Sequence, residues 1–136
     1  MKALYVDTSA ALKQVRRESE TDAYLDYLGE QVEGGTVLTS SLLLDVELAR
    51  FAVREGLDHA ERVAPVLAAF ARRQISPAVV RGAAAIEVHV RGLDAIHLAT
   101  AAQLGTDLVA VVTYDRQMRA AARALGLPVV APGSVG

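Results

Sequence analysis

The chain has 136 residues, of which 52% are hydrophobic, with a mean hydropathy of +0.28 and a formal net charge of −2. A chain of this length fits one domain, residues 1–136, whose core is large enough to fold without disulfide or zinc staples. It contains no cysteine, which excludes disulfides, thiolate metal sites and cysteine nucleophiles. The slightly negative charge argues against binding of nucleic acid by bulk electrostatics, so any action on nucleic acid requires a local site.

No segment has the roughly 18 consecutive apolar residues that a membrane-spanning helix needs. The apolar run near the N-terminus, residues 3–6, leads directly into a predicted strand and is too short for a secretory signal. We therefore expect a cytoplasmic protein that has no contact with a membrane.

Strands and helices alternate in the predicted secondary structure. The first half of the chain predicts a strand at 3–6, a helix at 8–15, a helix from the capping residue Ser19 to 32, a strand at 36–39 and a helix at 42–55 that Ser41 caps. A helix at 58–73 follows, which Pro65 kinks or splits, and then a short strand at Ile75. The remaining elements are a helix from Pro77 to 90, a helix from Asp94 to 105, a strand at 108–112, a helix at 116–125 and a strand at 129–130. This alternation implies right-handed crossovers and a central parallel sheet with helices on both faces, which is a three-layer α/β/α sandwich.

Four acidic residues occur in apolar surroundings, where an unpaired carboxylate is costly: Asp7, Glu47, Asp94 and Asp115. Asp7 ends the first predicted strand, and Asp115 lies just beyond the strand at 108–112. In a parallel α/β sheet, ligands bind at the carboxyl ends of the strands, so these two carboxylates lie at one edge if their strands are neighbours. Glu47 and Asp94 lie near helix starts that belong to the same edge. Four converging carboxylates would suit a hard divalent cation, Mg²⁺ or Mn²⁺.

Each acid also has a purely structural interpretation. Asp7, Asp94 and Asp115 could each cap the helix that follows. Glu47 could pair on the surface with an arginine further along its helix. We favour a shared site because one cleft accounts for all four positions together.

Asp45 provides an internal comparison for Glu47. Two residues along a helix are about 200° apart around its axis, so only one of the two acids can face a given cleft. We choose Glu47, because Leu43, Arg50 and Arg54 extend its side of the helix as a mixed stripe from cleft to solvent. Asp45 is expected to be exposed.

His97 lies three residues after Asp94 and shares its helix face. A role as metal ligand or general base is conceivable, but we favour a structural histidine whose hydrogen bonds are satisfied. No serine combines with a histidine and a carboxylate in a recognisable hydrolase motif, so a covalent serine mechanism has no support.

Five segments that span nearly the whole chain carry a family resemblance: residues 5–10, 40–49, 93–101, 112–115 and 121–127. They resemble a PIN domain, specifically that of the ribonuclease toxins of VapBC toxin–antitoxin pairs. The block Leu-Asp-Ala-Ile-His-Leu-Ala-Thr-Ala at 93–101 is highly specific, and all four acids have the order and spacing of the family.

The resemblance implies a metal-dependent endoribonuclease that uses Mg²⁺ or Mn²⁺ and leaves 5′-phosphate and 3′-hydroxyl ends. The family's catalytic and metal-binding acids correspond to Asp7, Glu47, Asp94 and Asp115. Thr8 and Thr113 match positions that support the site by hydrogen bonding. The resemblance further implies an RNA substrate, a homodimer and a cognate VapB-like antitoxin whose C-terminal segment covers the cleft.

Three other functions are weighed against this one. A receiver-like phosphotransfer domain would need an acidic pair near the first strand and a late lysine, whereas this chain has Asp7 alone there and no lysine after Lys13. A haloacid-dehalogenase-like phosphatase would need an aspartate where Ser9 stands. A non-catalytic protein-binding module with the PIN fold stays open.

Overall fold

Five parallel strands form the centre of the computed structural model, which describes residues 1–134. The strands are β1 (Ala3–Val6), β2 (Val37–Ser41), β3 (Ala71–Arg73), β4 (Leu108–Val112) and β5 (Val129–Val130). Their order across the sheet is β3-β2-β1-β4-β5, and every neighbouring pair is parallel. The strands that precede Asp7 and Asp115 are therefore neighbours at the centre of the sheet, as a common acidic edge requires.

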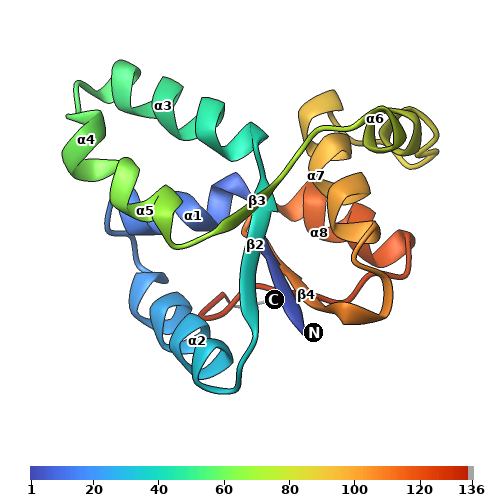
Figure 1. Cartoon of the computed structure of the whole chain (residues 1–136), viewed down its shortest axis with the longest axis horizontal. Helices are drawn as coiled ribbons and strands as arrows, with labels where there is room; N and C mark the ends of the chain where they lie inside the picture. The colour runs from blue at the N-terminus through green and yellow to red at the C-terminus, as the bar shows by residue number, and fades with distance from the viewer. Residues whose placement is uncertain (135–136) are drawn as a thin grey trace.

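Helices connect the strands and cover both faces of the sheet (Figure 1). The helices are α1 (Thr8–Val15), α2 (Thr21–Glu33), α3 (Leu43–Glu55), α4 (His59–Arg62), α5 (Ala64–Ala68), α6 (Pro77–Ala84), α7 (Gly92–Ala102) and α8 (Arg116–Ala124), with a short 3-10 helix, η1 (Gly105–Asp107). In Figure 1, α1 to α5 lie on one side of the sheet and α6, α7 and α8 on the other. The predicted three-layer α/β/α sandwich is confirmed.

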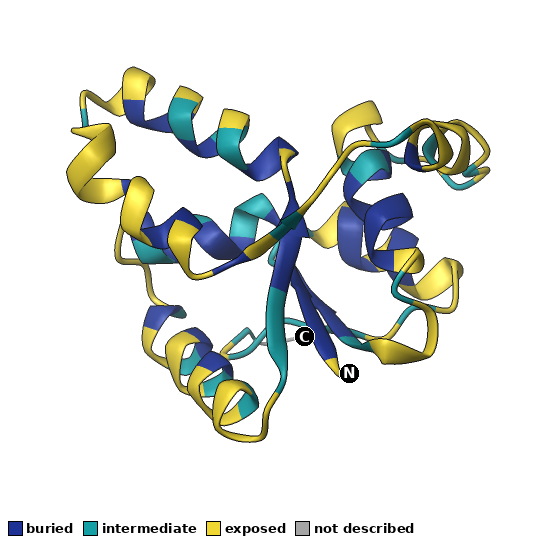
Figure 2. Cartoon of the chain, viewed as in Figure 1, coloured by how far each residue is buried: buried dark blue, intermediate teal, exposed yellow. Residues whose placement is uncertain are grey.

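The side chains of β1 alternate between the two helical layers, as strand geometry requires. Leu4 and Val6 are fully buried in the core beneath α1 to α5, where they join residues such as Leu48. Tyr5 points to the opposite face and packs with Ala101 of α7 and Val111 of β4. In Figure 2, β1 and the inward faces of the helices are buried, whereas the edge strand β3 is largely exposed. The register of β1 thus delivers Tyr5 to the layer that contains α7.

The predicted helix at 58–73 is split near Pro65, as expected, but its last residues form a strand, so its predicted extent is wrong. It consists of α4, α5 and then β3, because Pro65 has no N–H with which to continue α4 into α5. The edge strand lies at 71–73 rather than at Ile75, since its residues pair with 39–41 of β2. Asp58 caps α4 as expected, with its carboxylate accepting the N–H of Glu61 at 3.0 Å.

Other helix boundaries also differ from the predictions. The residue before α2 is Glu20, which makes no side-chain cap bond, so the predicted cap at Ser19 is wrong. The helix after Ser76 ends at Ala84 rather than residue 90. Asp94 does not open its helix, because α7 begins at Gly92 and places Asp94 in the first turn.

The carboxyl ends of β1 and β4 lie side by side. The N–H of Asp7 donates to the carbonyl oxygen of Val112 at 3.1 Å, so the pairing of the two strands continues beyond Val6. Because α1 starts directly after β1 and α8 shortly after β4, both helix N-termini lie at this edge. This is the edge at which ligands bind in parallel α/β sheets.

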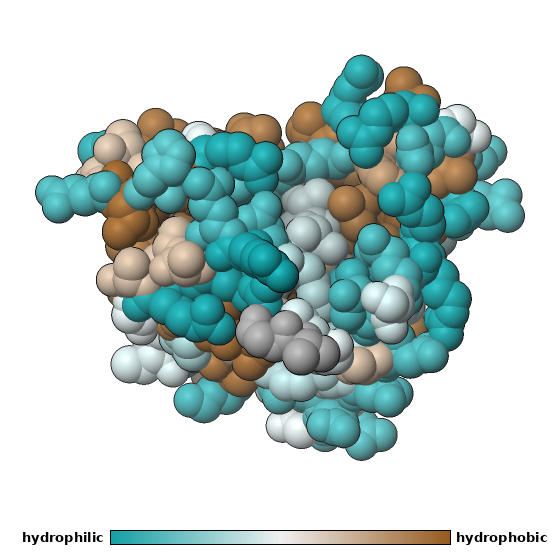
Figure 3. Space-filling model, turned by 180° about the vertical axis from the view of Figure 1, so that it is seen from behind, coloured by the Kyte–Doolittle hydropathy of each residue, from teal (hydrophilic) through white to brown (hydrophobic). Residues whose placement is uncertain are grey.

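The face seen in Figure 3 is mainly hydrophilic, with apolar residues gathered in small separate patches. Large exposed apolar side chains include Val46 and Val53 of α3 and Leu93 of α7. Within residues 1–134, no helix combines the length and the apolar character that crossing a membrane demands.

Candidate active site at the carboxyl edge of the sheet

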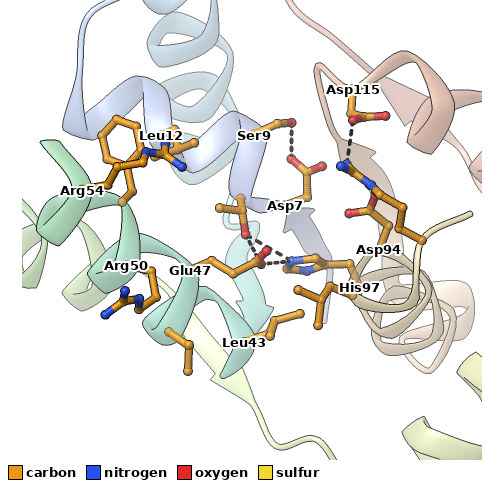
Figure 4. A pocket seen from close by; sticks show the side chains of 15 residues that line it. Asp7, Ser9, Leu12, Leu43, Glu47, Arg50, Arg54, Asp94, His97 and Asp115 are labelled. Atoms are coloured by element: carbon orange, nitrogen blue, oxygen red, sulfur yellow. Dashed lines mark hydrogen bonds and ion pairs between the residues drawn. The ribbon is translucent and has the colours of Figure 1, made fainter.

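A cleft of about 590 Å³ opens at the carboxyl edge, between α1, α3 and the start of α7. All four predicted acids line it: Asp7, Glu47, Asp94 and Asp115. Figure 4 shows Asp7 near the centre, Glu47 on the α3 side, and the other two acids on the opposite side. The structure therefore gathers the acids in one cleft, as strand-end geometry predicts.

Asp7 lies at the base of the cleft with only 3% of its surface exposed. As the N-cap of α1, its Oδ1 accepts the N–H of Ala10 at 3.0 Å and the hydroxyl of Ser9 at 2.7 Å. Burial raises the pKa of this carboxyl, against the opposing effects of His97 and the hydroxyls of Thr113 and Ser9. A cation in the cleft would relieve the cost of the buried charge.

Glu47 reaches the cleft from the second turn of α3. Its Oε1 accepts the hydroxyl of Thr8 at 2.5 Å and lies 2.9 Å from Nε2 of His97. Burial favours the neutral acid, but the hydrogen bonds from His97 and Thr8 outweigh it and hold the pKa of Glu47 below its usual range. The alternative of a surface pair with an arginine is wrong: within residues 1–134, the side chains that contact the Glu47 carboxylate are those of Thr8 and His97.

His97 is buried and uses both of its ring nitrogens. Nδ1 lies 2.7 Å from the hydroxyl of Tyr5, and Nε2 contacts Glu47 and, at 3.2 Å, the hydroxyl of Thr8. The favoured interpretation, a histidine whose hydrogen bonds are satisfied, is confirmed.

Asp94 and Asp115 share one arginine on the other side of the cleft. The guanidinium of Arg91 lies 3.0 Å from Oδ2 of Asp94 and 3.2 Å from Oδ2 of Asp115. The hydrogen bond and charge of Asp94, with the charge of Asp115, raise the pKa of this guanidinium. Asp115 also caps α8, with Oδ1 accepting the N–H of Met118 at 2.9 Å. Asp115 therefore both caps a helix and lines the cleft, as Asp7 does.

The two predicted supporting threonines lie beside the acids. Thr8 donates to Glu47, and Oγ1 of Thr113 accepts the N–H of Asp115 at 3.2 Å. Sequence reasoning missed Ser9, whose hydroxyl donates to Asp7, accepts the N–H of Tyr114 at 2.9 Å and lies 3.3 Å from Oγ1 of Thr113. The sequence offered one indication of this role: Ser9 lies two residues after Asp7, the aspartate that ends the first predicted strand.

Arg91 was also missed as part of the cleft. The sequence did hint at its contact with Asp94, because Arg91 lies three residues earlier and two such residues can touch at the start of a helix. Contact with Asp115 depends on the fold, because 24 positions separate the two residues.

Asp45 was expected to be exposed, but its side chain is about one-third exposed and forms an ion pair. Its Oδ1 lies 2.7 Å from Nε of Arg72 on β3. It is absent from the lining of the cleft, whereas Leu43, Arg50 and Arg54 line it with Glu47. The helical phase that separates Glu47 from Asp45 is therefore confirmed, and the exposure of Asp45 is corrected.

The donor chemistry of the cleft can be compared with the needs of a divalent metal ion. Within residues 1–134, no three acidic or histidine side chains already converge on a position that would hold an ion. The acids nevertheless offer the carboxylate oxygens that Mg²⁺ and Mn²⁺ prefer. A cation, the guanidinium of Arg91, already lies between Asp94 and Asp115, so this space accepts positive charge. The four acids fit such an ion, with Arg91 as a competing cation.

An all-parallel, five-stranded α/β sandwich with an acidic cleft at its carboxyl edge defines the class of this protein. Its sequence matches the PIN domain family over residues 4–124, and the chain belongs to that family. It is 45% identical over 138 aligned residues to ribonuclease VapC35 of Mycobacterium tuberculosis (strain CDC 1551 / Oshkosh), covering 96% of this chain and 97% of that protein. It is 38% identical to ribonuclease VapC46 of Mycobacterium tuberculosis (strain ATCC 25618 / H37Rv), covering 97% and 99%.

Solved structures share the fold at low sequence identity. A chain of VapBC2 from Rickettsia felis, crystallised with a DNA fragment from its promoter, superposes with a TM-score of 0.76 at 11% identity, covering 96% of this chain and 98% of that one. A chain of FitAB bound to the IR36 DNA fragment gives a TM-score of 0.66 at 16% identity, covering 98% and 97%. These likenesses confirm the PIN-like architecture.

Proposed function

We propose that this protein is a divalent-metal-dependent endoribonuclease that acts as the toxin of a toxin–antitoxin pair. The observation that carries the proposal is the gathering of four carboxylates from distant segments in one cleft at the carboxyl edge. Membership of the PIN domain family and identity to VapC ribonucleases support RNA as the substrate.

In this proposal Asp7, Glu47, Asp94 and Asp115 are the catalytic acids and the ligands of Mg²⁺ or Mn²⁺. When bound, such an ion lowers the pKa of a water molecule and offsets negative charge on a phosphodiester. Water adds to phosphorus, the P–O3′ bond breaks, and the 3′ oxygen takes a proton, which leaves a 5′-phosphate and a 3′-hydroxyl.

The remaining residues of the cleft position these acids. Ser9 and the backbone N–H of Ala10 fix one oxygen of Asp7, which is a rigid placement because α1 begins at the next residue. Thr8 fixes Glu47, and Thr113 orders the turn that presents Asp115. We propose Thr8 and Thr113 as supporting residues on this basis.

Arginines on the α3 side of the cleft suit an RNA strand. Arg50 and Arg54 line the cleft beside Glu47, and their side chains project from a helix that is exposed along this face. Guanidinium groups bind phosphate oxygens well, so these two residues would hold the RNA backbone next to the acids. Such a local site is compatible with a chain whose net charge is −2.

The proposed partners are a VapB-like antitoxin and a second copy of this chain. The likeness to a chain of VapBC2 bound to promoter DNA, and to a chain of FitAB bound to a DNA fragment, supports the antitoxin. A small DNA-binding protein encoded in an adjacent reading frame is expected to suppress the activity. Its absence would favour a solitary nuclease in the cytoplasm over a toxin.

The direct test is RNA cleavage by the purified protein. Total RNA is incubated with the protein, with the protein and EDTA, and with EDTA followed by excess Mg²⁺ or Mn²⁺, and the new ends are mapped. We expect cleavage that EDTA abolishes and either ion restores, with 5′-phosphate ends. Stable binding of a partner protein without any cleavage would instead identify a non-catalytic module.

A further inference from the structure

The hydrogen bonds of Glu47 continue behind the cleft into the core between the sheet and α7. We propose that His97, oriented by Tyr5, is a positioning residue that fixes the carboxylate of Glu47 for the reaction. This inference rests on the proposed function and adds two buried residues to it.

The network joins four elements of the fold. Tyr5 comes from β1, Thr8 from α1, Glu47 from α3 and His97 from α7. Figure 1 places α3 and α7 on opposite sides of the sheet, and Figure 4 shows Glu47 extending from α3 to His97. Glu47 is the acid that α3 contributes, whereas Asp94 lies on the same helix as His97. The bond between Glu47 and His97 therefore ties the two walls of the cleft together.

The hydroxyl hydrogen of Tyr5 determines which atoms donate and which accept in these hydrogen bonds. A tyrosine hydroxyl keeps its hydrogen at neutral pH, and Tyr5 is fully buried. A buried hydroxyl hydrogen needs an acceptor, and Nδ1 of His97 lies 2.7 Å away. With Nδ1 as acceptor, the ring hydrogen is on Nε2, which lies 2.9 Å from Oε1 of Glu47. Tyr5 thus selects the tautomer in which His97 donates to Glu47.

Both donors meet the same oxygen of Glu47. Oε1 takes the hydrogen bonds from Thr8 and His97, while none of the hydrogen bonds or ion pairs within residues 1–134 involves Oε2. When hydrogen bonds hold one oxygen of a carboxylate, the other oxygen also has a fixed position. Residues that hydrogen-bond to metal ligands commonly orient the ligands in this way. Because Glu47 lines the cleft, its second oxygen is available to a ligand there.

Space filling alone does not account for these two residues. A leucine at position 97 would fill a similar volume, but it would remove one donor from Glu47 and the acceptor from Tyr5. A glutamine can place an amide N–H near the position of Nε2. His97→Leu and His97→Gln are therefore a matched pair that separates hydrogen bonding from packing.

The test is a double-mutant cycle between His97 and Glu47, measured by RNA cleavage and by Mn²⁺ titration calorimetry. In the wild-type background, we expect His97→Leu to lower kcat and Mn²⁺ affinity about 10- to 100-fold, as loss of a residue behind a metal ligand typically does. His97→Gln should retain most of both. In a Glu47→Gln background, His97→Leu should change either quantity by less than about twofold, because contacting residues are not additive.

Tyr5→Phe is the second variant, since it removes one oxygen and keeps the packed ring. We expect folded protein with kcat and Mn²⁺ affinity reduced about three- to tenfold, less than in His97→Leu. If His97→Leu does not fold, Tyr5→Phe carries the test. Unchanged cleavage and unchanged Mn²⁺ affinity in folded Tyr5→Phe would overturn the role of Tyr5.

Two outcomes would overturn the role of His97. One is an equal loss from His97→Leu in the wild-type and Glu47→Gln backgrounds. The other is an equal loss in His97→Gln and His97→Leu when circular dichroism shows both to be folded. Absence of RNA cleavage by the wild-type protein would contradict the proposed function instead, and the Mn²⁺ cycle would still test the positioning of Glu47.

Discussion

The guanidinium of Arg91 lies 3.2 Å from a carboxylate oxygen of Asp115, a residue 24 positions further along the chain. The same guanidinium lies 3.0 Å from Asp94, so one cation joins an acid that follows β4 to an acid in the first turn of α7. The side chain of Arg91 is 69% exposed, which leaves both ion pairs open to exchange with solvent ions. A divalent cation bound by these acids would compete with Arg91 for them.

Arg91→Gln is therefore expected to raise the affinity for Mn²⁺ about three- to tenfold, because the acids lose a competing counter-ion. Titration calorimetry at low salt measures the change. Arg50→Gln is the matched control, since Arg50 lines the same cleft and, within residues 1–134, forms no ion pair with the acids. An equal gain in both variants would show a general effect of net charge rather than competition at Asp94 and Asp115.

Asp7 should make stability depend on pH in a defined direction. Burial raises its pKa in the folded protein, so its contribution to stability is full below the unfolded pKa of about 3.9 and is lost as pH rises through the folded value. Asp7→Asn keeps a capping oxygen for α1 but does not titrate. We expect the variant to melt a few degrees above the wild type at pH 7, with the difference vanishing near pH 3.

The same experiment has a metal arm. Mn²⁺ should raise the melting temperature of the wild type at pH 7 and have little effect on Asp7→Asn, because binding stabilises only a protein that retains its ligands. Calorimetric scans across pH, with and without Mn²⁺, check both expectations. A variant that melts below the wild type at pH 7 would contradict the buried-charge account.

Glu47→Gln should lower RNA cleavage strongly, whereas Asp45→Asn should leave cleavage almost unchanged. Loss of the Glu47 charge is expected to lower RNA cleavage at least about tenfold, because the variant loses a ligand of the proposed ion. Asp45→Asn breaks an ion pair with Arg72 outside the cleft, so cleavage should stay within about twofold and the free energy of unfolding should fall by about 0.5 kcal/mol. Equal losses of activity would mean that helical phase identified the wrong acid.

Strand-end geometry explains how much of the site could be predicted from the sequence. The strands β1 and β4 can be predicted from their apolar composition. Asp7 directly follows β1, and Asp115 lies three residues after the end of β4. Once the two strands are taken as neighbours, the common edge follows for any parallel sheet. The helical phase of Glu47 is likewise local, because it depends only on residue spacing.

The partners of these acids could not be predicted in the same way. The contact of Arg91 with Asp115, and that of His97 with Glu47 50 positions away, depend on how α7 packs against the sheet. β3 was missed for a similar reason: Ala71–Arg73 includes two arginines and has no strand-like composition, and only its pairing with β2 makes it a strand.

The central claim, that the acidic cleft cleaves RNA, is tested most directly by comparing Asp94→Asn with Asp107→Asn. Asp107 precedes β4, at the opposite edge of the sheet, and pairs with the N-terminal amine, so its variant removes the same charge far from the cleft. With Mn²⁺ present and both proteins folded by circular dichroism, Asp107→Asn should cleave RNA at the wild-type rate, and Asp94→Asn should be at least about 100-fold slower. Wild-type cleavage by Asp94→Asn would contradict the assignment of the active site.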